Sequence, residues 1–219
     1  MRSTAPLARS PSRSALARVL ALAAVTAGAA CSGPVVTVEV LPPRTSLSCT
    51  APGPDDPALG RGLLDAKATT SVHGGYQADL RMVVSAANAR VDGIDVKLSR
   101  DGAELKVLLN VPTGDVVLVG SGDDVRKAVV ENVELIPRSV AVDLAKDTKI
   151  TDLEFATIVA EISPRVIDTG VVPESSTFAL DVCNGCLVTP PNPCGAVVRN
   201  PVCRVGQDVP LFSCPGGAP

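Results

Sequence analysis

The sequence predicts an all-β protein, an antiparallel β-sandwich with one short helix and an irregular, cysteine-rich C-terminal tail. Two observations predict this fold. Apolar and polar residues alternate with a period of two along several short segments, and glycines punctuate the chain between them. Hydrophobic residues make up 46% of the 219 residues but aromatic residues only 2%, so we expect a core of valine, leucine, isoleucine and alanine. This much apolar material excludes a wholly disordered chain.

The strands follow from the alternation. In residues 76–84, the apolar face carries Tyr76, Ala78, Leu80, Met82 and Val84, and the polar face carries Gln77, Asp79 and Arg81. The runs 94–99 and 103–109 alternate on either side of Asp101-Gly102, which predicts a hairpin because a type I′ turn needs positive φ at both central residues. Further strand candidates are 35–40, 63–72, 115–119, 127–135, 153–163 and 176–183.

One segment has the character of a helix. It begins at Pro137, a residue suited to the first helical turn, and runs to Lys146. Eight or so short strands with regular turns then favour a sandwich that is immunoglobulin-like in architecture. The Cys–Trp–Cys core of true immunoglobulin domains is absent because the chain has no tryptophan.

The first thirty residues have the pattern of a secretory signal. They contain four arginines and no acidic residue, and the first acid in the chain is Glu39. An apolar run from Val19 to Ala30 comes after the arginines and ends in small residues. This run is shorter than the ~20 residues that span a bilayer. We therefore interpret residues 1–30 as a lipoprotein signal peptide.

Cys31 is the predicted site of lipid attachment. Residues 28–31, Gly-Ala-Ala-Cys, resemble the lipobox of bacterial lipoproteins, in which the signal is cut before a cysteine that carries a diacylglycerol thioether. Residues 27–29 also fit an ordinary signal-peptidase site. Cysteine parity favours the lipobox, because acylation of Cys31 leaves six of the seven cysteines to pair. Ser32 comes next and no Asp is present there, and in Gram-negative lipoproteins this resembles the pattern sorted to the outer membrane.

The mature chain divides into three predicted parts. Residues 31–60 hold the lipidated cysteine and a proline-rich tether, 61–183 the sandwich, and 184–219 a cysteine- and proline-rich tail packed on it. Removal of the four signal arginines changes the net charge from −3 to −7, since 16 basic and 23 acidic residues remain. We expect no nucleic-acid partner, because the chain lacks both a basic surface and aromatic stacking residues.

Six cysteines are disulfide candidates. They are Cys49, Cys183, Cys186, Cys194, Cys203 and Cys214. Five of them lie in the tail, so Cys49 must reach the tail if all six pair. Two alternatives are weaker. The Cys183-Asn184-Gly185-Cys186 sequence lacks the succeeding helix of a thioredoxin-type redox site, and a zinc ribbon needs a second CxxC pair.

The tail also carries a resemblance. The sequence from Val182 to Val188, Cys203-x2-Gly206-Gln207-Asp208 and the terminal Cys214 resemble the C-terminal signature of predicted lipoproteins from myxobacteria. The start at Leu63-Leu64-Asp65 and the Tyr76 strand also resemble the first strands of these proteins. The resemblance implies a compartment and a fold, and no activity.

Functional motifs are otherwise few. The single histidine, His73, lies beside two glycines in a predicted turn, and the chain contains no nucleophile elbow or phosphate-binding loop. We therefore expect no catalytic residue, metal or cofactor, and a non-enzymatic lipoprotein that contacts membrane lipid through acylated Cys31 and binds an envelope protein. A secreted enzyme or inhibitor with an unrecognised loop site, or a zinc or redox cysteine module, is the alternative.

Overall fold

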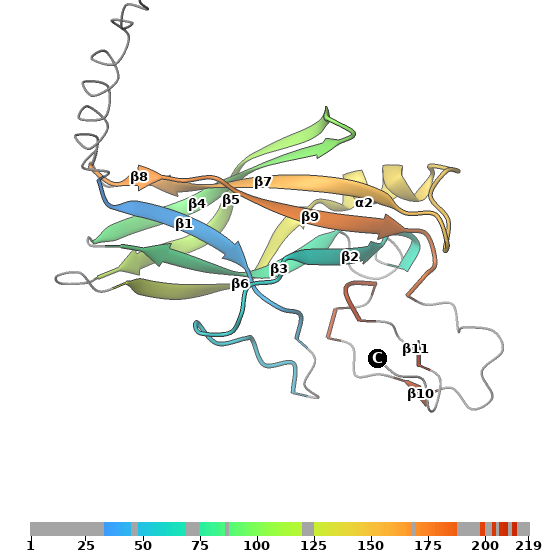
Figure 1. The fold of residues 1–219 in the computed structure, drawn as a ribbon, viewed down its shortest axis with the longest axis horizontal. Coiled ribbons are helices and arrows are strands. Elements are labelled where there is room, and N and C mark those ends of the chain that lie inside the picture. The colour runs from blue at the N-terminus through green and yellow to red at the C-terminus, as the bar shows by residue number, and fades with distance from the viewer. Residues whose placement is uncertain are drawn as a thin grey trace, which may run out of the picture. The chain divides into compact units, whose positions relative to one another are not determined.

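The chain divides into two units, Met1–Ser32 and Gly33–Pro219. The computed structural model describes residues 33–44, 48–68, 75–85, 88–119, 125–167, 170–187, 198–199, 203–204, 206–209 and 212–213, all in the second unit. Within these ranges two sheets pack face to face as a β-sandwich (Figure 1), which confirms the predicted fold class.

The strand order defines the two sheets. The four-stranded sheet contains, in order across it, β6 (Arg126–Ile136), β3 (Tyr76–Val84), β1 (Val35–Val40) and β8 (Val172–Pro173). The five-stranded sheet contains β2 (Arg61–Asp65), β9 (Ser176–Cys183), β7 (Ala156–Val166), β4 (Ala89–Arg100) and β5 (Ala103–Leu118). Two short tail strands, β10 (Val198–Arg199) and β11 (Phe212–Ser213), form a third, separate pair.

Most strand pairs are antiparallel, but both sheets are mixed. β1 pairs with β8 in parallel, and β2 pairs with β9 in parallel. The purely antiparallel sandwich expected from the sequence is therefore wrong at two pairs. Alternation along a strand specifies which face is buried and not the direction of its neighbour, so the sequence carried no signal for these pairs.

The predicted hairpin is confirmed. β4 and β5 pair in antiparallel register, with Arg100 opposite Ala103. Asp101 and Gly102 both have positive φ, 51° and 78°, as the type I′ turn requires. The helix α2 (Arg138–Ala145) begins directly after Pro137, as predicted, and buries Ala141 and Leu144.

The predicted tether is shorter than expected. Val36 and Val38 of β1 are completely buried between the sheets, and Leu41 is also buried. Backbone hydrogen bonds run from Leu41 N–H to the Asp79 carbonyl and from Leu59 N–H to the Val40 carbonyl. Residues 33–44 therefore belong to the sandwich, and the irregular residues 48–60 are held against it, so these residues do not form a free tether.

The predicted strand 63–72 also ends early. β2 stops at Asp65, and residues 66–68 are helical. The Asp65 carboxylate accepts a hydrogen bond from the Ala68 N–H at 3.1 Å, the geometry of a side chain capping a helical turn. Residues 69–72 lie outside the described residues.

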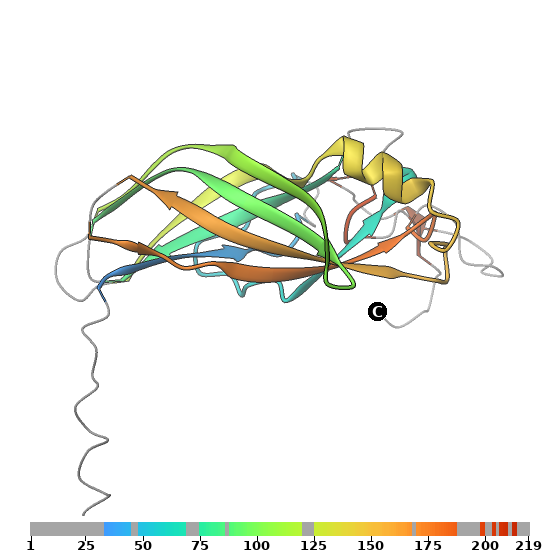
Figure 2. The same cartoon turned by 90° about the horizontal axis from the view of Figure 1, so that it is seen from above.

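The sandwich has two ends that differ in character (Figure 2). The N-terminal end is the one at which β1, β4 and β6 begin and β3, β5 and β7 end, with β8 beside β1. The tail end is the opposite one, where β3 and β7 begin and β9 ends.

Candidate functional site

The tail end is held by two disulfides. Cys49 and Cys203 are joined across 154 residues of sequence, with their Cα atoms 5.4 Å apart. This bridge links the start of the folded unit to the tail, as the cysteine count predicted. Cys183 is joined to Cys186, only three residues away. Cys194 and Cys214, the other two candidates, lie outside the described residues, as do Cys31 and His73.

The loop closed by Cys183–Cys186 is fixed by a buried carboxylate. Asp65 is inaccessible to solvent, and its two carboxylate oxygens accept hydrogen bonds from Gly185 N–H at 2.8 Å and Leu187 N–H at 2.9 Å. Together with the Ala68 bond, these contacts satisfy the carboxylate with backbone donors. Asp65 therefore determines the position of both the loop and the end of β2.

The same three residues are the group most suited to a metal in the described part of the chain. One ligand atom from each of Asp65, Cys183 and Cys186 lies within 4.8 Å of the others. Cysteine binds a metal as its thiolate, however, and both sulfurs here are oxidised to a disulfide. A metal at this position would require prior reduction of the bridge.

A strip of the tail, Gly206–Asp208, closes the outer edge of β2. Asp208 N–H donates to the Leu63 carbonyl at 2.8 Å, and Asp65 N–H donates to the Gly206 carbonyl at 2.8 Å. The Gln207 side chain, itself buried, donates to the Gln77 carbonyl at 3.1 Å. The Gly-Gln-Asp segment, the Leu63–Asp65 strand and the Tyr76 strand, which the sequence singled out separately, thus meet at one place.

The Asp208 carboxylate is the centre of this strip. It accepts hydrogen bonds from Leu63 N–H at 2.7 Å and from the Tyr76 hydroxyl at 2.9 Å. Burial raises the pKa of Asp208 above its ordinary value, and these two hydrogen bonds and the charge of Arg204 only partly oppose the effect. Burial, and then the adjacent Asp208, raise the pKa of Tyr76 well above its ordinary value.

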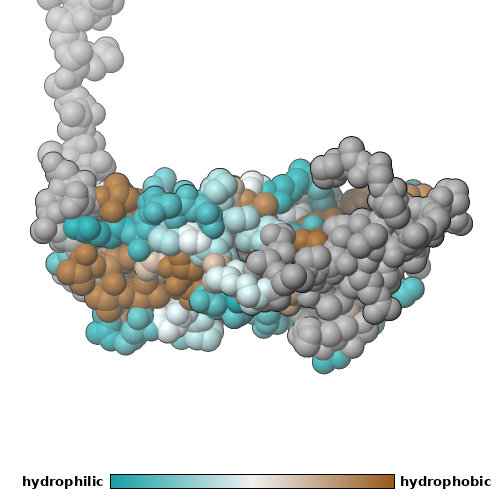
Figure 3. Space-filling model, turned by 90° about the horizontal axis from the view of Figure 1, so that it is seen from below, coloured by the Kyte–Doolittle hydropathy of each residue, from teal (hydrophilic) through white to brown (hydrophobic). Residues whose placement is uncertain are grey.

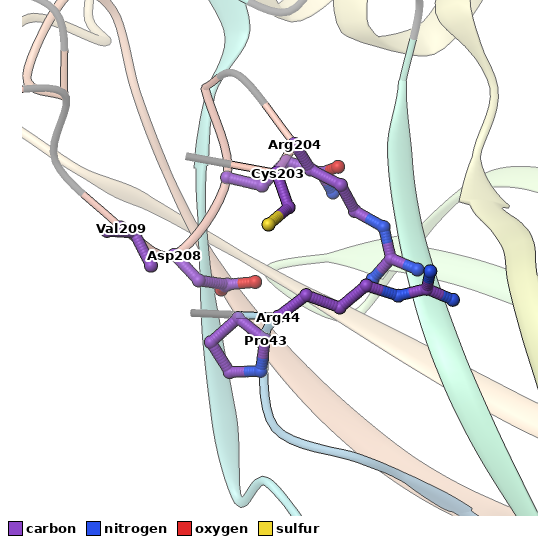
Figure 4. A pocket seen from close by; sticks show the side chains of 7 residues that line it. Pro43, Arg44, Cys203, Arg204, Asp208 and Val209 are labelled. Carbon is purple, nitrogen blue, oxygen red and sulfur yellow. The ribbon is translucent and has the colours of Figure 1, made fainter. Parts of the chain in front are cut away.

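A second buried carboxylate, Asp79, joins four segments. The Arg44 guanidinium donates two hydrogen bonds to it, from Nε at 2.7 Å and from Nη2 at 2.8 Å, and Arg204 donates to it at 2.6 Å. The backbone N–H of Asn132, at a left-handed position with φ of 57°, donates at 2.9 Å. Figure 4 shows the Arg44 and Arg204 guanidinium groups lying beside each other and extending in the same direction.

The arginines decide the charge state of Asp79. Burial alone would raise its pKa, but the hydrogen bonds from Arg44, Asn132 and Arg204 outweigh burial and hold the pKa below its ordinary value. The pKa of Arg44 is raised, first by its hydrogen bond to Asp79. Asp79 is therefore an ionised group within a closed network.

The sequence missed this role. Its alternation placed Asp79 and Arg81 on the solvent face of their strand, and both are buried, because the irregular segment before β2 covers that face. Arg81 holds this segment with hydrogen bonds to the Pro54 and Asp56 carbonyls at 2.9 and 2.6 Å, and it also binds the Glu39 carboxylate. Nothing in the local sequence signals a covering segment. The only available sign was the predicted link of Cys49 to the tail.

The hollows at this end are a small cavity and an open groove. The cavity between Arg44, Cys203 and Arg204 has a volume of about 10 Å³, the space of about one water molecule. A groove of about 440 Å³ lies along β2, lined by Leu59, Arg61, Leu63, Phe155 and Asp181, with Pro43, Gly62 and Asp208. Arg61 and Asp181 form an ion pair in it at 2.5 Å, which lowers the pKa of Asp181. The groove is open to solvent, and Arg61 and Asp181 neutralise each other in it.

No protein-family model matches the chain, and no curated protein matches it. Three solved structures show a remote likeness. A protein from Archaeoglobus fulgidus is 14% identical with a TM-score of 0.28, over 49% of this chain and 87% of that chain. A protein assigned to the late embryogenesis abundant (LEA) class is 19% identical with a TM-score of 0.33, over 70% and 74% of the two chains. The periplasmic chaperone SfaE is 11% identical with a TM-score of 0.31, over 72% and 85%.

These identities and TM-scores carry no argument about function. Among the described residues, no helix is long and apolar enough to cross a membrane.

Proposed function

We propose that this chain is a non-enzymatic cell-envelope lipoprotein, anchored in the outer membrane through acylated Cys31, whose sandwich binds another envelope protein. The observation that carries the proposal is the use of its cysteines. Four of the seven are in the disulfides Cys49–Cys203 and Cys183–Cys186, which suit an oxidising compartment outside the cytoplasm.

The division of the chain supports the anchor. The folded unit starts at Gly33, two residues after Cys31, so an acylated Cys31 would sit directly before the sandwich. A single acyl chain holds a protein only marginally, whereas the two or three chains of a lipoprotein cysteine make release very slow.

The chemistry of the tail end supports a structural rather than a catalytic role. Asp65, Asp79 and Asp208 each receive two or more hydrogen bonds from other parts of the fold. Groups engaged in this way hold segments together and are not presented to a substrate.

The partner surface in this proposal is the β4–β5 hairpin. β5 is an edge strand of the five-stranded sheet, and its Leu105, Val107 and Leu109 side chains are exposed, Leu109 to 72%. Edge strands with exposed apolar side chains are surfaces on which an extended segment of another protein can add.

Metabolic labelling with palmitate tests the anchor. We expect label in the unaltered chain, none in Cys31→Ala, and retained label in Cys186→Ala, a cysteine of the tail. An unlabelled parent chain would refute the anchor.

Photo-crosslinking from position 109 tests the partner surface, with position 153 as an exposed control. A discrete crosslinked protein from position 109 alone supports the hairpin, and identical products from both positions refute it.

A further inference from the structure

Exposed apolar side chains gather at the N-terminal end of the sandwich. Five are about half exposed or more, and two more on the outer face of the four-stranded sheet are partly exposed. They are Val117, Val119, Val125, Ile167 and Val172, with Val35 and Val83. Figure 3 shows apolar surface on the left of the molecule, the end at which Figure 1 labels β8.

Strand register places four of these residues in two groups. Val117 lies opposite Arg90 in the β4–β5 pair, and Ile167 N–H donates to the Arg90 carbonyl at 2.9 Å. Val35 lies opposite Val172 in the β1–β8 pair. Exposed apolar side chains therefore lie at this end of both sheets, Val117 and Ile167 on one and Val35 and Val172 on the other.

Two ion pairs flank the apolar surface at this end. Arg90 is paired with Asp115 at 2.7 Å, and Arg165 with Asp92 at 3.5 Å. Paired charges neither attract nor repel a zwitterionic surface.

Exposed apolar residues also occur elsewhere, at Leu153 and Phe155 of the tail end and on the β4–β5 hairpin. What distinguishes the N-terminal end is its position on the chain. Gly33 lies there, where a Cβ on it would be 3.4 Å from the Gly170 carbonyl oxygen, and Cys31 is two residues away in sequence. Two residues span at most about 7 Å.

We infer that the N-terminal end of the sandwich rests in the interfacial layer of the lipid bilayer, with Val117, Val119 and Ile167 among the side chains that enter it. The inference depends on the proposed acylation of Cys31, because a lipid on that residue brings this end, and not the tail end, to the membrane surface. These apolar side chains would be transferred from water into the boundary between headgroups and acyl chains, at a depth of about 5–10 Å. The sandwich is then held upright, with its disulfide-closed end directed away from the bilayer.

Tryptophan substitution tests this directly, because the chain contains no tryptophan and a single introduced one gives an unmixed signal. The lipidated full chain carrying Val119→Trp is reconstituted in phosphatidylcholine vesicles whose acyl chains are brominated. Leu153→Trp is the matched control, an exposed apolar position at the opposite end. Ile167→Trp serves as a second probe of the N-terminal end if Val119→Trp fails to fold.

Co-sedimentation with the vesicles is measured first, and it reports the anchor alone. Failure to co-sediment refutes the proposed function. For chains that co-sediment, we expect the tryptophan at position 119 to emit at shorter wavelength and to be quenched on the order of 2-fold or more, as for a side chain below the headgroups. We expect no quenching at position 153. Absence of quenching at position 119, or equal quenching at both positions, overturns the inference while leaving the anchor intact.

Discussion

At the N-terminal end the strands finish at exposed valine and isoleucine side chains, whereas at the tail end irregular segments cover buried carboxylates and are closed by disulfides. Both ends belong to one sandwich and share its aliphatic core. The difference lies in the segments that extend beyond the strands. At the tail end, Arg44, Arg204 and the Gly206–Asp208 strip extend over the sheet and bind it through Asp79 and Tyr76.

This comparison shows two ways of finishing a sheet. The tail segments have little apolar surface to bury, so the hydrophobic core does not hold them. Disulfides and charged hydrogen bonds fix them instead. The N-terminal end keeps apolar surface exposed, and a contiguous exposed apolar surface marks a contact with a partner or a membrane.

The largest expected effect is loss of the long bridge. Cys49→Ser with Cys203→Ser should lower the free energy of unfolding by about 5 kcal/mol, because the bridge closes a loop across 154 residues. Cys183→Ser with Cys186→Ser opens a far shorter loop and should cost about 2 kcal/mol. Urea unfolding without reductant measures both. Equal costs for the two bridges would show that chain entropy is not what the long bridge supplies.

Removal of the Asp79 charge comes next. Asp79→Asn leaves two nearly buried arginines without their shared counter-ion and should cost about 3–5 kcal/mol. Asp115→Asn, which breaks the exposed pair with Arg90, should cost less than about 1 kcal/mol. A similar, small cost for both in thermal and urea unfolding would mean that the Asp79 network does not hold the covering segments.

Asp79 and Asp208 should respond to pH in opposite directions. The pKa of Asp79 is lowered on folding, so its contribution is present above the unfolded value of about 3.9 and is lost as pH falls through the folded pKa. The pKa of Asp208 is raised, so its contribution is present below about 3.9 and is lost as pH rises through the folded pKa. Unfolding free energies measured from pH 3 to 7 should show that Asp208→Asn removes the loss of stability that accompanies rising pH. An unchanged profile would place Asp208 in solvent.

Tyr76→Phe has a smaller expected effect. The variant deletes the hydroxyl that donates to Asp208 but keeps the ring, which packs 5.9 Å from that of Phe178. We expect a loss of about 1–2 kcal/mol, as for the removal of one partner of a buried hydrogen bond. Differential scanning calorimetry at neutral pH measures it, and a loss as large as that for Asp79→Asn would contradict the ranking.

The smallest expected effect is at the N-terminal end. Val119→Ser should change the unfolding free energy of the unanchored chain by less than about 0.5 kcal/mol, because this side chain is 67% exposed. Val38→Ala, in the completely buried part of β1, should cost about 2 kcal/mol in the same assay. A large loss for Val119→Ser would show that this surface is already covered by the protein itself.

The sequence predicted the sandwich well where its signal is local. Alternation identified most of the strand 76–84 surface, Asp101-Gly102 identified the hairpin, and Pro137 identified the start of the helix. Counting cysteines even predicted a long-range contact, that of Cys49 with the tail. The burial of Asp79 could not be predicted, because the face it shares with Gln77 and Arg81 is polar in sequence and is covered by residues far away along the chain.

The role of Asp65 was hidden for a related reason. The sequence places it inside the predicted strand 63–72, and only the return of the Cys183–Cys186 loop beside it creates the carboxylate site. The parallel pairing of β2 with β9 that brings them together is a property of the whole topology.

The most direct test is a mass-spectrometric map of peptides from the full chain, digested without reduction. We predict that the N-terminal peptide begins at Cys31 and carries a diacylglycerol mass, and that the peptides containing Cys49 and Cys203 are joined by a disulfide. A chain with an unmodified residue 31, or with Cys31 itself joined to one of the six later cysteines, would contradict the proposal of a lipid-anchored sandwich closed at its far end.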